Sequence, residues 1–337
     1  MSKPLNAQDA IFYGSFVQAA YAMFLADDTN LRPDPAGRGV PDGWDVVAWI
    51  TMKDFFLFRS FEKFYGILAE KRDSPSSYVL AIRGTEEAIE WFDDANAFLV
   101  PFDHVQGAGF VHKGFMTIYD TIKVTPREPA RAVERAAPNA PAAATVLAQP
   151  TGSFADQIAQ VVSRRSAAGR PTQAVAEGVS LAGAEVVVAG HSLGAALATL
   201  YVVENTKKHA IANPLVCTFA SPRVGDQTFV DTFNGFGLTS WRIENVPDWA
   251  PDLPPDVWGY RHVDAVTLVD SSAAVQPTLA CSHAITTYFH MLDPAQPVRP
   301  ECVLTEEEAR RLREQLPDPA TADQEVNATS GVHSGDA

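Results

Sequence analysis

The stretch Glu185–Gly194, which reads EVVVAGHSLG, joins a run of valines to a G-x-S-x-G motif. A continuous β-branched, apolar run of this kind is typical of a strand that is covered on both faces. The residues that follow, up to Glu204, are rich in Ala and Leu and have the composition of a helix. The stretch therefore predicts a buried strand, a sharp turn and a helix, with Ser192 at the turn.

The G-x-S-x-G motif indicates a nucleophilic serine because of where it lies. On its own the motif arises often by chance, but here a buried strand precedes it and a helix follows it, as a nucleophile elbow requires. Side chains at Gly190 and Gly194 would collide with the neighbouring backbone in such a turn. The turn would hold Ser192 in a strained conformation with its hydroxyl exposed. We therefore favour a nucleophile over a serine in an ordinary strand-to-helix turn.

Other short β-favouring runs alternate with helical segments along the chain. They lie at Val46–Ile50, Tyr65–Glu70, Tyr78–Ile82, Leu215–Phe219, Trp241–Ile243 and Val263–Val269. The turn cluster Ser74–Ser77 predicts that the second and third of these runs form a hairpin. The alternation predicts an α/β fold with a mostly parallel central sheet flanked by helices.

Composition and charge narrow the classes of function. The 337 residues are 46% hydrophobic and 20% charged, so the chain can bury a sizeable core. With 26 Lys and Arg against 41 Asp and Glu, the net charge is −15. This charge argues against nucleic acid as a partner, because basic side chains are needed to replace the counterions of phosphates. No apolar run reaches the roughly 18 residues of a membrane span, so we expect no integral membrane segment.

One domain is expected over residues 1–303. Prolines and alanines crowd Val124–Pro150, which predicts no single fixed structure there, within a flexible insertion near residues 124–176. Inside this insertion, Ser153–Arg165 regains helical periodicity and starts with a Ser/Asp capping pair. Residues 304–337 are expected to form a short helix and an acidic, disordered tail.

The N-terminal segment is expected to be a helix packed on the body of the protein. Apolar residues within Phe12–Met23 fall at helical spacing, and Asn6 with Asp9 resembles a helix start. The alternative is a cleaved signal peptide, because Ala20-Tyr21-Ala22 imitates a cleavage site, although the stretch before it carries a single Lys. The expected location is therefore cytoplasmic, with secretion by a signal-independent route as the alternative.

The three cysteines, Cys217, Cys281 and Cys302, cannot form a disulfide framework, and their spacings do not fit a zinc site. We expect three thiols. The alternative is a Cys281–Cys302 pair, which requires that the chain meet an oxidising compartment.

A serine needs a base to become a nucleophile, and the base needs an orienting acid. In folds with this elbow, the acid and then a histidine follow the serine along the chain. His283 precedes an apolar run and would lie at a loop-to-helix junction, where such a base belongs, and His262 is its rival. The other three histidines after the elbow lie at a helix end, within the apolar run and near the C-terminus: His209, His290 and His333.

Asp248 is the candidate acid. It follows a strand that ends near Val246, and Pro247 keeps that residue extended, so the chain leaves the strand before it presents the carboxylate in a loop. Asp252 and Asp256 come later, in a Pro-rich loop to which we assign a structural rather than a catalytic role.

The chain resembles the class 3 (fungal-type) lipases, which are α/β-hydrolases, in a series of blocks that occur in the family's order. Ile82–Thr85 resembles the oxyanion strand, and Gly190–Gly194 resembles the nucleophile block, with Ala195 where the family more often has a third glycine. The resemblance spans about residues 45–292. The remaining blocks are 88–94, 111–115, 218–226, 245–255, 260–262 and 282–284.

This resemblance implies a carboxylic ester hydrolase that works through an acyl-enzyme intermediate. Ser192 falls on the family's nucleophile, Asp248 on its acid and His283 on its base. His262 falls on a non-catalytic histidine. The backbone N–H groups of Thr85, helped by its hydroxyl, and of Leu193 would hold the oxyanion.

Acylglycerols are the substrates that the resemblance implies, so the enzyme would be a triacylglycerol lipase that contacts a lipid–water interface transiently. Phospholipase A1 and a short-chain carboxylesterase are the enzymatic alternatives. A lipid-binding protein without turnover is the alternative outside enzymes. Neither a metal ion nor an organic cofactor is implied.

We interpret Glu86–Asn96 as a lid. Helical spacing places Ala88, Ile89 and Phe92 on one face and acidic residues on the others. In water the apolar face would cover the acyl pocket, and at a lipid surface it would turn outward. A fixed amphipathic helix packed on the core is the alternative.

Overall fold

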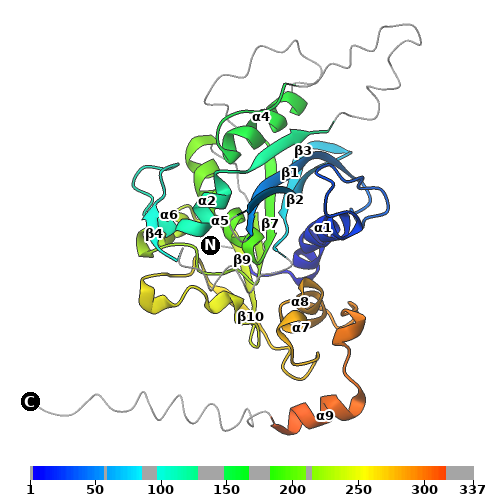
Figure 1. The fold of residues 1–337 in the computed structure, drawn as a ribbon. Helices are drawn as coiled ribbons and strands as arrows, with labels where there is room; N and C mark the ends of the chain where they lie inside the picture. Colours follow the sequence, from blue (N-terminus) through cyan, green and yellow to red (C-terminus); the bar gives the residue numbers. More distant parts are fainter. Residues whose placement is uncertain are drawn as a thin grey trace, which may run out of the picture.

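The valine run that precedes the G-x-S-x-G motif forms β7 (Glu185–His191), near the middle of an eight-stranded sheet in a computed structural model (Figure 1). The structure describes residues 3–56, 59–85, 97–127, 148–166, 183–209 and 215–315. The other strands of the sheet are β1 (Trp44–Phe56), β2 (Arg59–Lys71), β3 (Ser74–Ile82), β6 (Lys123–Pro126), β8 (Leu215–Phe219), β9 (Thr239–Asn245) and β10 (Val266–Val269).

The order of strands is β10-β9-β8-β7-β3-β2-β1-β6. The five strands from β10 to β3 run parallel to one another, and β2, β1 and β6 are added in antiparallel pairings. The predicted fold class is therefore confirmed, as is the predicted hairpin, which β2 and β3 form. A separate two-stranded sheet joins β4 (Leu99–Pro101) to β5 (Phe110–His112).

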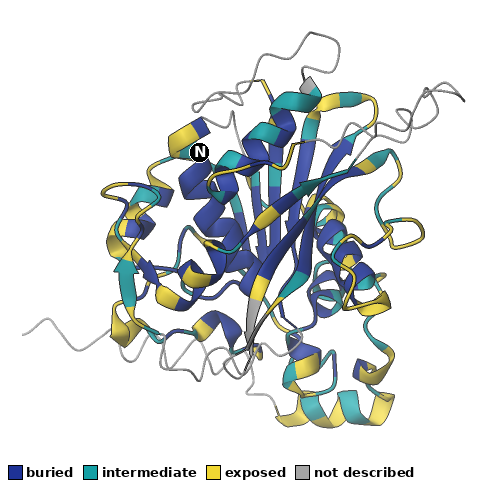
Figure 2. Ribbon diagram, turned by 45° about the horizontal axis from the view of Figure 1, so that its top comes forward, coloured by how far each residue is buried: buried dark blue, intermediate teal, exposed yellow. Residues whose placement is uncertain are grey.

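Helices cover both faces of the large sheet, and most residues of its central strands are buried (Figure 2). On one face, α1 and α8 pack against apolar side chains of the sheet, and α2, α4, α5 and α6 pack on the other face. Side chains of β3 alternate between these two cores, as a strand covered on both faces requires. The helices are α1 (Ala7–Ala26), α2 (Lys113–Tyr119), α4 (Phe154–Ser166), α5 (Leu193–His209), α6 (Gln227–Asn234), α7 (Leu279–Ser282), α8 (Ile285–Leu292) and α9 (Glu306–Gln315).

Helix α1 begins where the sequence indicates. The Asn6 side chain caps it by accepting hydrogen bonds from the N–H groups of Gln8 and Asp9. Phe16 and the later apolar residues of the periodic set are buried, whereas Phe12 is 38% exposed, because it lies at the edge of the helix face that contacts the sheet.

The Pro- and Ala-rich region holds more regular structure than its composition suggests. The expectation of no fixed structure is wrong for Val124–Pro126, which pair with β1 as part of β6. An edge strand tolerates a proline at its end, and the Gln157 side chain accepts a hydrogen bond from the Val124 N–H at 2.8 Å. Helix α4 forms as predicted, with Ser153 and Asp156 as its capping pair. Residues 128–147 and 167–182 lie outside the described ranges.

The expectation of three thiols is wrong, because Cys281 and Cys302 form a disulfide with their Cα atoms 5.4 Å apart. The short 3-10 helix η3 (Pro300–Cys302) brings Cys302 beside α7, an approach that spacing along the chain does not reveal. Cys217 is a buried thiol in β8.

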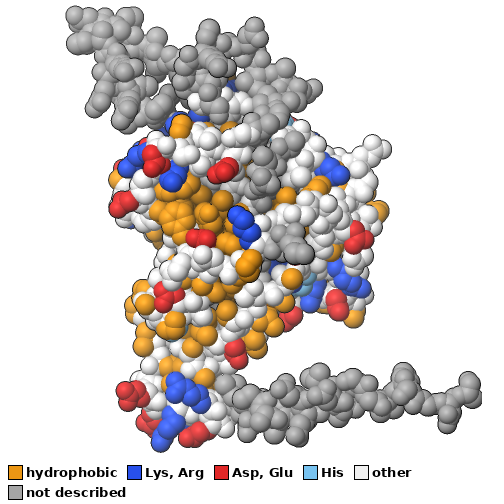
Figure 3. Space-filling model, turned by 180° about the vertical axis from the view of Figure 1, so that it is seen from behind, with side chains coloured by type: hydrophobic (Ala, Val, Ile, Leu, Met, Phe, Trp, Pro, Cys, Tyr) orange, Lys and Arg blue, Asp and Glu red, His pale blue; other side chains and the backbone are white. Residues whose placement is uncertain are grey.

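Helix α9 ends the described chain and presents charged side chains of both signs to solvent, whereas hydrophobic side chains gather above it on the rear face (Figure 3). The predicted tail beyond α9 lies outside the described residues. In the part of the chain that the structure describes, every helix is too short or too polar to cross a bilayer.

Candidate active site

Ser192 occupies the turn between β7 and α5 with a positive φ of 57°. This left-handed conformation is costly for a residue with a side chain and is typical of a nucleophile elbow. The two motif glycines are required by close backbone approaches. A Cβ at Gly190 would lie 2.5 Å from the carbonyl oxygen of Gly194, and a Cβ at Gly194 would lie 2.2 Å from that of Ile82. The predicted strained turn is therefore present.

The hydroxyl of Ser192 is not exposed as expected, because the residue is only 1% exposed. The chain that leaves β3 passes beside it. A Cβ at Gly84 would lie 2.8 Å from the Cβ of Ser192, so the absence of a side chain at this position lets the backbone pass directly beside the serine.

Asp248 lies just beyond β9, and its N–H donates to the carbonyl of Asn245 at 2.8 Å. Its buried carboxylate accepts three hydrogen bonds. His283 Nδ1 and the Tyr288 hydroxyl donate to Oδ2, each at 2.7 Å, and the Ala250 N–H donates to Oδ1 at 3.0 Å. Burial raises the pKa of the Asp248 carboxyl, but these hydrogen bonds and the nearby His283 outweigh burial and lower it. The carboxylate is therefore ionised over the neutral range.

His283 lies between α7 and α8, the predicted loop-to-helix junction. Its Nδ1 is held by Asp248, whereas its Nε2 is buried and has no hydrogen-bond partner in the described part of the chain. The Oγ of Ser192 is likewise buried and unpartnered there. The structure thus brings Asp248 and His283 together and leaves unpaired the two atoms that would exchange a proton.

The rival histidines are not paired with Asp248. His262 Nε2 donates to the carbonyl of Pro251 at 2.9 Å, and burial together with nearby arginines lowers its pKa to about 3. His290 Nδ1 bonds the carbonyl of Gln296. His209 bonds Asp156, at the helix end where the sequence places it. His333 lies outside the described ranges.

Thr85 follows β3 at the edge of the sheet where β7 ends in the elbow. It is 8% exposed, and its hydroxyl is buried without a hydrogen-bond partner among the described residues. Leu193 is the first residue of α5, and the first N–H groups of a helix lack partners within the helix. Of the predicted oxyanion residues, Leu193 therefore follows the serine directly, and Thr85 follows Gly84, which lies against the serine. The predicted lid, Glu86–Asn96, lies outside the described residues.

A chain of buried hydrogen bonds connects these elements, and the sequence does not predict it. The Gly84 N–H donates to the Tyr21 hydroxyl at 2.8 Å, which contacts Nδ1 of His191 at 2.8 Å. The Nε2 of His191 lies 2.8 Å from the carbonyl of His283. Because a carbonyl only accepts, Nε2 carries the proton and Nδ1 accepts from Tyr21. Burial and the nearby His283 lower the pKa of His191 to about 3, which keeps this neutral tautomer.

Tyr21, His191 and Tyr288 support the predicted site residues but escape prediction. His191 stands at a variable position of the G-x-S-x-G motif, and the two tyrosines lie in helices whose spacing explains them as core residues. Within the described ranges, no three His, Cys, Asp or Glu side chains gather as metal ligands.

Known proteins that are similar to this chain are lipases and phospholipases. A family model described as Lipase (class 3) matches residues 79–258, more than half of the chain. Phospholipase A1-II 3 of Oryza sativa subsp. indica is 26% identical over 320 residues, which cover 80% of this chain and 68% of the rice protein. The lipase of Rhizomucor miehei is 25% identical over 281 residues, which cover 79% of this chain and 65% of the fungal protein.

Among solved structures, the native Rhizomucor miehei lipase propeptide complex is similar with a TM-score of 0.51 at 17% identity. The match covers 78% of this chain and 68% of that one. At this identity the likeness shows the fold.

Proposed function

Since the chain belongs to the class 3 lipase family of lipid ester hydrolases, we propose that it cleaves carboxylic esters with Ser192 as nucleophile, His283 as base and Asp248 as orienting acid. One observation carries this proposal. Asp248 holds Nδ1 of His283, while Nε2 of that ring and Oγ of Ser192 are both buried and have no partner among the described residues. Buried polar atoms are nearly always hydrogen-bonded, so an unsatisfied hydroxyl on the strained turn and an unsatisfied nitrogen on the ring that Asp248 holds support a reactive site.

In the proposed first half-reaction, Ser192 Oγ attacks the ester carbonyl carbon and Nε2 of His283 accepts the hydroxyl proton. The ester C–O bond breaks, the same Nε2 donates that proton to the departing alcohol, and an acyl-enzyme remains. Water then attacks the acyl carbon with His283 again as base, which releases the carboxylic acid and restores the serine. Asp248 stabilises the imidazolium and fixes the tautomer throughout.

The carbonyl oxygen becomes negatively charged in each tetrahedral intermediate. We assign its stabilisation to the N–H groups of Thr85 and Leu193. The positive end of the α5 helix dipole favours the oxyanion at this place, and the unpartnered Thr85 hydroxyl offers a further donor.

Acylglycerols are the proposed substrates, so the proposed activity is that of a triacylglycerol lipase acting at a lipid–water interface. The Rhizomucor miehei relative, a lipase by name, supports this choice. Apart from the ester and a water molecule, the proposed reaction uses only side-chain and backbone groups of this chain.

Phospholipase A1 activity is a second candidate, because relatives from rice carry that name. The two candidates share the proposed acyl-enzyme chemistry and differ in the alcohol that leaves, a diacylglycerol or a lysophospholipid.

Hydrolysis of triolein and of phosphatidylcholine, with fatty acid release measured by titration, tests both candidates. We expect faster release from triolein by the wild type and none from either lipid by Ser192→Ala. Faster release from phosphatidylcholine would assign the phospholipase activity. Equal release by the wild type and Ser192→Ala would overturn the proposed chemistry.

A further inference from the structure

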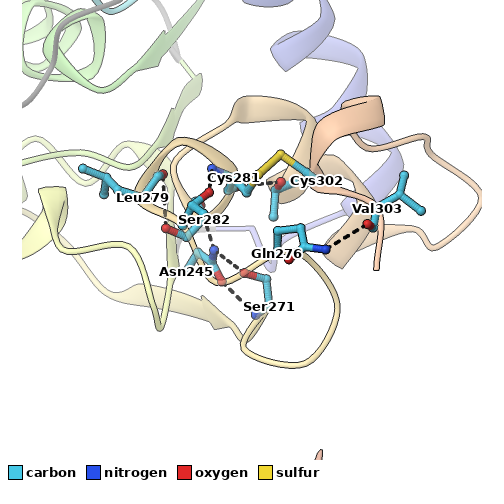
Figure 4. The surroundings of a disulfide bond; sticks show 10 residues. Asn245, Ser271, Gln276, Leu279, Cys281, Ser282, Cys302 and Val303 are labelled. Carbon is cyan, nitrogen blue, oxygen red and sulfur yellow. Dashed lines mark hydrogen bonds between the residues drawn. A yellow bond between two sulfur atoms is a disulfide. The ribbon is translucent and has the colours of Figure 1, made fainter. Parts of the chain in front are cut away.

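Asn245, the last residue of β9, uses its whole side-chain amide in buried hydrogen bonds (Figure 4). Its Nδ2 donates to Ser271 Oγ at 2.7 Å and to the carbonyl of Ser282 at 2.8 Å, and its Oδ1 accepts from the Ser271 N–H at 2.9 Å. The residue is 1% exposed. Such a buried amide fixes whatever it binds, because losing a partner would leave a polar atom unsatisfied.

The partners of Asn245 lie next to both members of the acid–base pair. Its backbone carbonyl accepts the N–H of Asp248 at 2.8 Å, which shapes the turn that presents the carboxylate. Its side chain holds the carbonyl of Ser282, the residue before His283. One residue thus contacts the backbone on the acid side and on the base side.

The next carbonyl along the chain is held as well, because His191 Nε2 donates to the carbonyl of His283 at 2.8 Å. Two consecutive carbonyls are therefore fixed by side chains from two different strands, β9 and β7. The short helix α7 carries this segment, and the Cys281–Cys302 disulfide attaches α7 to η3 just before it (Figure 4).

We propose that Asn245 is a positioning residue for the acid–base pair: its amide fixes the backbone that carries His283 so that Nδ1 meets Asp248. This inference rests on the proposed function of Asp248 and His283. A displacement of about 1 Å at a reacting group can cost about 100-fold in rate. Loss of the amide is therefore expected to lower kcat by about 10- to 100-fold and to leave KM nearly unchanged, because Asn245 makes no contact with substrate in this scheme.

Ser271→Ala is the matched control. It removes one hydrogen bond of the same buried amide but leaves the bond from Asn245 to the Ser282 carbonyl. If Asn245 only stabilises the fold, both Asn245→Ala and Ser271→Ala should lower the unfolding temperature, and neither should change kcat per active site. If it positions His283, only Asn245→Ala should lower kcat.

The test measures kcat and KM on p-nitrophenyl butyrate for the wild type, Asn245→Ala and Ser271→Ala, well below their unfolding temperatures, with active sites counted by a fluorophosphonate. The expected result is a loss of kcat of at least about tenfold in Asn245→Ala alone, with KM within about twofold. If Asn245→Ala does not fold, Asn245→Asp takes its place, because it keeps the side-chain shape but turns an acceptor toward the Ser282 carbonyl.

Two outcomes would overturn the inference: kcat per active site that stays near the wild-type value, or an equal loss in Ser271→Ala. The same series includes His283→Ala. Full activity in that variant would refute the proposed function itself, so the two failures are distinguishable.

Discussion

In the part of the chain that the structure describes, two buried carboxylates each contact a histidine and a tyrosine, and we assign the proposed active site to one of them. Asp248 accepts from His283 and Tyr288. Glu204, inside α5, accepts from the Tyr119 hydroxyl at 2.5 Å and lies 3.1 Å from Nδ1 of His104. Both carboxylate side chains are fully buried.

The difference lies in the second nitrogen of each imidazole. His104 Nε2 bonds Asp120 at 2.8 Å, so both of its ring nitrogens contact carboxylates. Burial lowers the pKa of His104, but Asp120 and Glu204 raise it to about 9, so this ring stays charged at neutral pH. His283 Nε2 has no partner in the described residues. A buried histidine–carboxylate pair is therefore weak evidence of catalysis by itself, and the ring nitrogen without a partner among the described residues is what distinguishes His283 from His104.

The largest expected effect separates the two histidines. His283→Ala should lower kcat by about 10⁴- to 10⁶-fold, because the base is lost, whereas His104→Gln should stay within about twofold of the wild type. Initial rates on p-nitrophenyl butyrate measure both. A loss of kcat in His104→Gln comparable to that in His283→Ala would show that the two regions do not differ in their role.

The two carboxylates should differ in the same way. Asp248→Asn should lower kcat by up to about 10⁴-fold, because the amide favours the wrong tautomer of His283. Glu204→Gln should leave kcat intact but destabilise the fold by up to about 3 kcal/mol, because His104 and Lys208 lose a charged partner. Paired kinetic and urea-unfolding measurements check this. A stable but inactive Glu204→Gln protein would contradict the comparison.

The two tyrosines that donate to these carboxylates, Tyr288 and Tyr119, should show a smaller difference in their effect on kcat. Tyr288→Phe removes one hydrogen bond to the ionised Asp248 and should lower kcat by about tenfold, the kinetic equivalent of a bond to a charged group. Tyr119→Phe removes the matching bond to Glu204 and should affect only the unfolding temperature. Equal kcat values for the two variants would mean that Tyr288 contributes packing alone.

Opposite pH dependences of stability should be the smallest effect. His104 has a raised pKa, so its stabilising contribution is complete below about pH 6.5, its unfolded value, and is lost as the pH rises through about 9. His191 is buried neutral with its pKa lowered to about 3, so stability falls as the pH drops from about 6.5 toward that value. Unfolding temperatures between pH 5 and pH 10 should therefore decline on both sides, and His104→Gln should flatten only the alkaline side. An unchanged alkaline decline would locate its cause elsewhere.

The sequence predicts those parts of the site that depend on local sterics. Gly190 and Gly194 are required by approaches of backbone to backbone at a turn, so their spacing, together with the strand before them and the helix after them, locates Ser192. The order of acid and base along the chain leaves His283 and His262 as candidates, the family resemblance favours His283, and the structure pairs His283 with Asp248.

Contacts between residues far apart along the chain leave no recognisable spacing in the sequence. Asn245 and Tyr288 act on neighbours that only the folded chain brings near, and the composition of their segments explains them equally well as core residues. For the same reason the sequence offers the Cys281–Cys302 disulfide only as an alternative to free thiols. The strand that begins near Val124 is not predicted, because the prolines nearby argue against a strand. It forms nevertheless, because this segment pairs with β1.

Covalent labelling measures the central claim, the activation of Ser192 by the unpaired nitrogen of His283, most directly. The wild type would be treated with a fluorophosphonate, the adduct mapped by peptide mass spectrometry, and the labelling rate compared with those of His283→Ala and His104→Gln. We expect a single adduct on Ser192, formed at the wild-type rate in His104→Gln and at least about 10³-fold more slowly in His283→Ala. An adduct on another residue, or labelling of His283→Ala at the wild-type rate, would contradict this claim.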